Sequence, residues 1–148
     1  MKKYLLFPLF CLWFAGCCPC VIKRVIDGKA AESVSTLGTF EGVFHYPQMQ
    51  DVKMELTLNL KGPGWAEGNY ILRETSLGED KTSVITRGEW TTLRGTPKDE
   101  NATVYQLEPD HYKRSKCFLK VSEMEIRQLD RDQKEIKSPT PLTLHKSK

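Results

Sequence analysis

Cysteine is the residue type with the most obvious chemistry in this chain, and the five cysteines are unevenly spaced. Four lie within the first twenty residues, and the fifth, Cys117, stands alone far along the chain. Cys17 directly follows Ala15-Gly16, and two small residues before a cysteine are what a lipoprotein signal peptidase requires of its cleavage site. The motif therefore predicts that Cys17 becomes the first residue of the mature chain and carries the lipid.

The residues before Cys17 have the order of an export signal. Lys2 and Lys3 supply a positive start, and Tyr4–Phe14 is an almost uninterrupted apolar run. A run of about 11 residues is too short for a transmembrane helix, which needs roughly 20. We therefore predict a signal peptide at residues 1–16 and a membrane attachment through the lipid on Cys17. The predicted location is the cell envelope, at the outer membrane.

Charge and the remaining cysteines exclude two further classes of protein. Loss of Lys2 and Lys3 with the signal reduces 22 basic residues to 20, beside 19 acidic residues. A chain so close to neutrality has no net basic surface to displace counterions, so no nucleic acid partner is expected. Cys18, Cys20 and Cys117 are an odd set, and a disulfide framework is not supported. Cys117 opens an apolar run, where a buried small hydrophobe is expected and a reactive thiol is the alternative.

No motif for catalysis occurs in the chain. Serine-hydrolase elbows, zinc-protease helices and phosphate loops are all absent from the sequence. Asp130, Asp132 and Glu135 have a spacing loosely like that of a calcium loop, but the 12-residue loop and its glycine are missing. We read these acids as a charged hairpin and predict that the protein is not an enzyme.

The elements that must position these residues are short β-strands. In Val52–Leu60 every second residue is apolar and the residues between are polar, a period of 2 that indicates one buried and one solvated face. This pattern places Met54 in the core. No window of the chain shows sustained helical spacing of apolar residues. Further expected strands are Thr39–Tyr46, Asn69–Glu74, Thr82–Thr92, Thr103–Leu107, Cys117–Val121, Met124–Leu129, Glu135-Ile136 and Pro141–His145.

Seven to nine short strands joined by hairpin-length loops predict an all-β fold. A small antiparallel barrel fits best because it leaves no exposed sheet edge, and an open sandwich remains the alternative. The expected segments are the signal peptide at 1–16, a lipidated cysteine and tether at 17–37, the barrel at 38–145 and a basic tail at 146–148. The tether's Val21-Ile22 and Val25-Ile26 pairs leave open a short added helix or strand.

Aromatic residues suggest two different uses of a barrel interior. They either wall a cavity for a small apolar ligand or pack against one another as a core, and the packed core is the expected arrangement. The set is Phe40, Phe44, Tyr46, Trp65, Tyr70, Trp90, Tyr105 and Phe118.

The order of these elements resembles the N-terminal domain of the NlpE-type copper-resistance lipoproteins, which are small lipocalin-like barrels of the bacterial envelope. The resemblance covers about residues 38–145. It is carried by the Cys17 motif and by six sequence pieces: Gly38–Val43, Met54–Leu58, Gly68–Leu72, Arg87–Trp90, Tyr105-x-Leu107 and Leu129–Ile136.

One departure from the family pattern concerns its possible metal chemistry. The family carries a Cys-x-x-Cys just after its first strand, and here Tyr46 and Met49 stand in those places. Neither side chain supplies a thiolate. The other candidate ligands for copper are His45, Met49 and Met54, because imidazole and thioether groups suit Cu(I). Met54 is expected in the core, which leaves His45 and Met49 as the predicted pair. Gln133 also replaces the glycine of the family's last hairpin.

The resemblance implies a non-enzymatic envelope lipoprotein related to copper-resistance and surface-stress proteins. Such a protein would act through contacts with an envelope protein partner or through weak copper binding. Two alternatives remain open from the sequence. One is a lipocalin-like carrier of a small apolar ligand, and the other is a structural accessory of the envelope.

Overall fold

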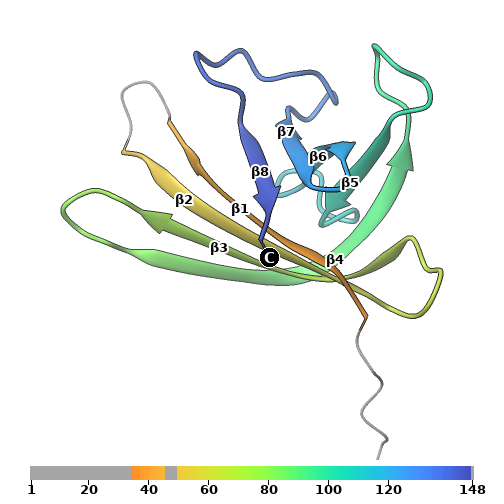
Figure 1. Cartoon of the computed structure of the whole chain (residues 1–148), viewed down its shortest axis with the longest axis horizontal. Coiled ribbons are helices and arrows are strands. Elements are labelled where there is room, and N and C mark those ends of the chain that lie inside the picture. The colour runs from red at the N-terminus through yellow and green to blue at the C-terminus, as the bar shows by residue number, and fades with distance from the viewer. Residues whose placement is uncertain (1–34, 46–49, 148) are drawn as a thin grey trace, which may run out of the picture. The chain divides into compact units, whose positions relative to one another are not determined.

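Short runs rich in β-branched and aromatic residues form eight strands, as the computed structural model in Figure 1 shows for residues 35–45 and 50–147. The strands are β1 (Thr36–Phe44), β2 (Val52–Leu60), β3 (Glu67–Ser76), β4 (Ser83–Arg94), β5 (Thr103–Leu107), β6 (Lys116–Ser122), β7 (Glu125–Leu129) and β8 (Thr143–Lys146).

The strands form one closed antiparallel barrel. Each strand pairs with the next in the sequence, and β8 returns to pair with β1. The closing contact is short, joining Phe40 to Lys146 and Glu41 to His145, and the Lys146 ammonium adds a hydrogen bond of 2.8 Å to the Leu37 carbonyl. The all-β barrel is therefore confirmed, its eight strands fall within the predicted seven to nine, and the open sandwich is excluded.

Alternation along the strands builds the core. In β2 the side chains of Met54, Leu56 and Leu58 are buried, as the period of 2 predicts, while the residues between them are only half-buried. The main core cluster fills the barrel, and a smaller cluster of Val104, Cys117 and Leu129 lies on the opposite, outer face of β5, β6 and β7. Both clusters and all strand pairs lie between Thr36 and Lys146, and residues 31–148 form a compact unit. We use the term isolated barrel for residues 31–148 produced without the preceding segment.

The strands on the two sides of the barrel differ in length. β4 has twelve residues and β5 has five. β4 pairs with β3 from Ser83 onward but with β5 only from Trp90 to Arg94. The first half of β4 therefore extends past the end of β5, and in Figure 1 the β3–β4 hairpin lies away from β5, β6 and β7.

Two strand predictions need correction. The run Glu135-Ile136 is not a strand, since its one pairing is an isolated bridge between Leu129 and Glu135. The reason is the Asp130 carboxylate, which accepts hydrogen bonds from the backbone N–H groups of Asp132 and Lys134 at 2.9 and 2.8 Å and holds a tight turn. The first strand begins at Thr36, earlier than the expected Thr39, and ends at Phe44.

The predicted export and anchoring segments lie outside the described residues. This applies to the signal peptide at 1–16, to Cys17 and to the tether as far as residue 34. Within residues 35–45 and 50–147, no helix has the length and apolar character needed to cross a membrane.

Gln133, which stands where the related hairpins have glycine, adopts a left-handed backbone conformation. Its φ is 59°, and a side chain in this region costs about 1–2 kcal/mol relative to the usual conformations. Glycine has no such cost, although it loses more conformational freedom on folding. The sequence departure therefore leaves local strain in the turn.

We expect Gln133→Gly to stabilise the isolated barrel by about 0.5–1 kcal/mol, because relief of the left-handed strain exceeds the added entropy loss. Urea unfolding followed by far-UV circular dichroism measures the change. Gln133→Ala keeps the Cβ atom and serves as the control, which should show no gain. An unfolding midpoint for Gln133→Gly at or below that of the parent chain would contradict the strain argument.

Candidate functional site

The proposed copper ligands lie at the end of β1 and in the segment after it. His45 is exposed, and its Nδ1 atom lies 2.9 Å from Oδ2 of Asp51. Met49 lies outside the described residues, so the structure does not show whether the two side chains meet, and the pair stays a prediction. Within the described ranges, no group of three or more His, Cys, Asp and Glu side chains is arranged to hold a metal ion.

Cys117 is buried, as the sequence predicts. It is 5% exposed and packs with Val104 and Leu129 in the smaller core cluster. Burial raises the pKa of its thiol, and a hydrogen bond with Ser115 offsets part of this increase. A thiol that stays protonated near neutral pH is a weak nucleophile, so Cys117 acts as a small core side chain.

The buried aromatic side chains pack inside the barrel as core residues. Trp90 and Tyr105 pack edge to face, with ring centroids 5.6 Å apart at 84°, and Nε1 of Trp90 donates a hydrogen bond of 3.0 Å to the Asn59 carbonyl. Trp65 is exposed, and Tyr46 lies outside the described residues. The buried members of the set are Phe40, Phe44, Tyr70, Trp90, Tyr105 and Phe118.

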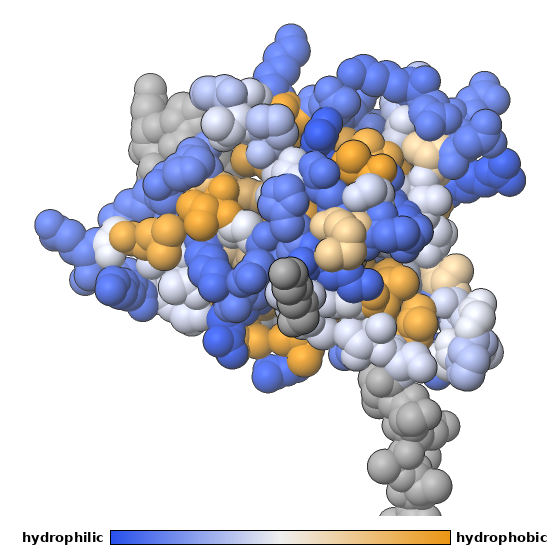
Figure 2. All heavy atoms as spheres, viewed as in Figure 1, coloured by the Kyte–Doolittle hydropathy of each residue, from blue (hydrophilic) through white to orange (hydrophobic). Residues whose placement is uncertain are grey.

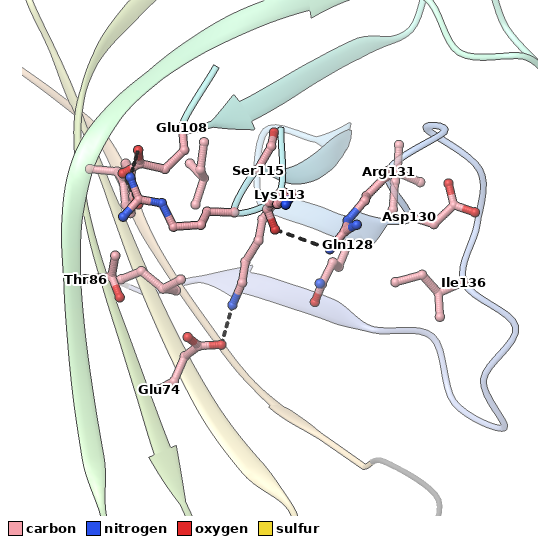
Figure 3. A pocket seen from close by; sticks show the side chains of 15 residues that line it. Glu74, Thr86, Glu108, Lys113, Ser115, Gln128, Asp130, Arg131 and Ile136 are labelled. Atoms are coloured by element: carbon pink, nitrogen blue, oxygen red, sulfur yellow. Dashed lines mark hydrogen bonds and ion pairs between the residues drawn. The ribbon is translucent and has the colours of Figure 1, made fainter. Parts of the chain in front are cut away.

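A cavity of about 510 Å³ opens where β4 extends past β5. Figure 3 shows Glu74 and Thr86 on one side of it, and Gln128, Asp130 and Arg131 on the other. Its volume lies within the range of roughly 300–1,000 Å³ typical of small-molecule sites. We call it the flank pocket. Its lining residues are Tyr70, Leu72, Glu74, Thr86, Leu107, Glu108, Lys113, Arg114, Ser115, Lys116, Gln128, Leu129, Asp130, Arg131 and Ile136.

Glu108 organises the upper part of the flank pocket. Its carboxylate accepts a hydrogen bond of 2.9 Å from the Tyr70 hydroxyl and lies 3.8 Å from the Arg114 guanidinium. Burial, together with this hydrogen bond, raises the pKa of the Tyr70 phenol, so the hydroxyl stays protonated and donates. Gly88 makes room for the carboxylate, because a Cβ atom there would lie 2.0 Å from Oε1 of Glu108.

The lower part of the flank pocket contains a second ion pair and two further cations. Lys116 pairs with Glu74 across the cavity. The Arg131 guanidinium donates a hydrogen bond of 3.2 Å to the Lys113 carbonyl. The described residues place no carboxylate within ion-pair distance of Lys113 or Arg131. The side-chain oxygen of Gln128 is buried and accepts no hydrogen bond from the residues described.

The first half of β4 presents an unpaired strand edge. Thr82 bonds toward β3 through its carbonyl, and Glu89 bonds toward β5 by accepting from Glu108 N–H at 2.9 Å. Since successive residues of a strand direct their backbone groups to opposite sides, the odd-numbered residues point away from β3. Their N–H and C=O groups have no backbone partner among the residues described from Ser83 to Arg87. We call Ser83–Arg87 the free edge.

Sequence reasoning missed both the flank pocket and the free edge. One signal was present, since Lys113 and Arg114 lie just before β6 and Lys116 begins it, which gathers three cations there. Gly88 gives no such signal, because its partner Glu108 is distant in sequence. Exposed apolar side chains do not mark the site either. The large ones, such as Trp65, Val84 and Met124, are scattered over the surface. Figure 2 shows small apolar groups separated by hydrophilic ones.

We expect Cys117 to react at least about tenfold more slowly with iodoacetamide at pH 8 in the folded isolated barrel than in urea, since burial restricts access and raises the pKa of the thiol. Cys117 is the only cysteine between residues 31 and 148, so mass spectrometry reports its alkylation directly. Similar rates in the two states would show that Cys117 is an accessible thiol.

Comparison with known proteins agrees with the barrel and its sequence pattern. The family model of the NlpE N-terminal domain matches residues 40–139, which is more than half of the chain. No curated protein and no solved structure matches the chain significantly. The matched range runs from β1 through β7 and includes most of the flank pocket and the free edge. The chain therefore belongs to the NlpE N-terminal domain family of envelope lipoproteins.

Proposed function

We propose that this chain is a non-enzymatic lipoprotein of the outer membrane, anchored through Cys17, that acts by contact with an envelope protein. The observation that carries the contact role is the free edge of β4. An exposed strand with unpaired backbone groups is a template for an added strand, and many recognition domains bind an extended peptide in this way. The Cys17 motif supports the anchor, which would hold the barrel at a membrane surface.

The side chains beside the free edge suit a partner strand on both faces. Thr86 lies on the same face of β4 as the buried Trp90, as does Val84, which is 55% exposed. Ile85, 43% exposed, and Arg87 lie on the opposite face. An added strand would cover apolar surface on both faces of β4. Its backbone would form hydrogen bonds with the outward N–H and C=O groups of Ser83, Ile85 and Arg87.

In cells that carry the full chain, a photoreactive benzophenone amino acid at Ile85 should crosslink to a discrete envelope protein. Val121 on β6 is the control position, because its exposure of 44% matches the 43% of Ile85. Equal adducts from both positions, or none from Ile85, would contradict the proposal.

Two variants of Arg87 separate backbone pairing from side-chain contact. Arg87→Pro removes the outward N–H group and should abolish the Ile85 adduct, since proline cannot donate to a ladder. Arg87→Ala removes the charge but keeps the N–H group, and should retain the adduct. Thermal unfolding of both isolated barrels checks that the fold survives. Loss of the adduct in Arg87→Ala alone would assign the contact to the side chain and overturn strand addition.

Copper binding is a second candidate function, and the geometry of His45 favours testing it. Asp51 holds Nδ1 of His45 and leaves Nε2 for a metal, the arrangement that a carboxylate commonly gives a ligating histidine. We expect the isolated barrel to compete with a chelator for Cu(I), and His45→Ala combined with Met49→Ala to remove that competition. The isolated barrel lacks Cys17, Cys18 and Cys20, so these thiols do not interfere.

The control for the copper titration is His145→Ala. His145 is an exposed histidine on β8, so its loss should leave Cu(I) affinity unchanged. Cu(I) binding that survives the double change at His45 and Met49 would exclude this pair as the ligands.

A further inference from the structure

We propose that the flank pocket binds an amphipathic anion with a single acyl chain, such as a fatty acid or a lysophospholipid. The chain would lie against the leucines of the floor, and the acidic head would lie at the rim beside Lys113, Lys116 and Arg131. This site shares Thr86 with the free edge, does not include His45, and takes a small molecule instead of a protein or a metal.

The charges around the flank pocket favour an anionic head. Glu74 is paired with Lys116, and Glu108 accepts from Tyr70 and lies near Arg114. The third acid, Asp130, accepts hydrogen bonds from its own turn. Every acidic group of the lining is therefore engaged. The positive groups are in excess, because the side chains of Lys113 and Arg131 have no carboxylate partner among the described residues.

The floor of the flank pocket favours an acyl chain over a free inorganic anion. Leu72 and Leu107 form it and are almost fully covered. Ile136, beside them, is half-buried and packs against the core. An anion without a chain would reach only the solvated rim, where each charge pair contributes little. Burial of methylene groups against these side chains supplies the larger attraction.

The Lys116–Glu74 pair lies between rim and floor. Lys116 comes from β6 and Glu74 from β3, so the pair crosses the cavity, as the dashed line from Glu74 in Figure 3 shows. An acidic head that takes the place of Glu74 beside Lys116 would separate the pair and open the floor to the chain. Glu74 therefore competes with the acidic head of the ligand for Lys116.

Gln128 provides a contact for ligands whose head carries a hydroxyl group. Its side-chain oxygen is buried at the pocket without a hydrogen-bond partner in the part of the chain described. Buried polar atoms are normally satisfied by protein, water or ligand. A lysophospholipid has a free hydroxyl that would donate to this oxygen, whereas a fatty acid has none at neutral pH.

Isothermal titration calorimetry of the isolated barrel tests the proposal with four probes, each kept below its micelle concentration. Oleate and oleoyl lysophosphatidate carry both chain and charge, monooleoylglycerol carries the chain alone, and acetate carries the charge alone. We expect saturable binding of one or both of the first two, and binding at least about tenfold weaker for the other two. The stronger of the two acidic probes identifies the head.

Variants then locate the bound ligand. Lys113→Ala with Arg131→Ala should weaken binding about fivefold or more, from the loss of two attractive charges. Lys81→Ala with Arg94→Ala removes the same charge from exposed positions outside the lining and should leave affinity unchanged. Thr86→Trp fills the cavity from an exposed strand position and should abolish binding.

Glu74→Gln separates competition for Lys116 from a purely structural role of the Glu74–Lys116 pair, because only competition predicts tighter ligand binding. It removes the internal competitor for Lys116, so affinity for the acidic probe should rise. Glu55→Gln, on the outer face of β2 beside Lys53 and Arg73, is the matched control and should have no effect. The proposal is overturned if monooleoylglycerol binds as well as oleate, if neither acidic probe binds, or if Thr86→Trp leaves binding intact.

Discussion

The difference in length between β4 and β5 is the constraint on which the functional features of this barrel depend. A closed antiparallel barrel satisfies its backbone groups only where each strand edge meets a neighbour. β5 covers β4 from Trp90 to Arg94 and no further. The uncovered part of β4 becomes the free edge, and the flank pocket opens beside it, where β5 has ended. Both features therefore have one structural cause.

Glu108 ends the pairing of β4 with β5. Its N–H group makes the last backbone hydrogen bond of that pairing, to the Glu89 carbonyl. Its φ of 51° then turns the chain away from the barrel, a conformation that costs a non-glycine residue about 1–2 kcal/mol. The hydrogen bond from Tyr70 offsets part of this cost. The closeness of its carboxylate to Gly88 explains why the facing position on β4 has no side chain.

Local patterns predicted most of the fold because they record which face of a strand is buried. The alternation in Val52–Leu60 correctly placed Met54 in the core, and the apolar run after Cys117 correctly placed that thiol inside. The same patterns do not record how long the neighbouring strand is. Val84 and Ile85 have the character of a well-covered strand, yet both are exposed because β5 ends before reaching them.

The candidate site was harder to predict because its contacts join residues distant in sequence. Tyr70 and Glu108 are 38 residues apart, and Glu74 and Lys116 are 42 residues apart. Neither spacing belongs to a motif, and each residue alone reads as an ordinary surface or core position. The family's Cys-x-x-Cys is a local signal, and its replacement by Tyr46 and Met49 removed the motif that sequence reasoning can associate with metal or redox chemistry. The remaining contacts of the candidate site form only when the barrel closes and brings distant strands together.

The common origin of the flank pocket and the free edge also means that they are not independent. Thr86 lines the pocket, while the adjoining residues Ile85 and Arg87 supply the outward backbone groups of the edge. A strand added to β4 would extend along the side of the pocket that β5 leaves open. It would narrow the pocket entrance or add atoms to its wall, and either change alters the affinity for a ligand. Thermodynamic linkage then requires the ligand to alter the affinity for the added strand by the same factor.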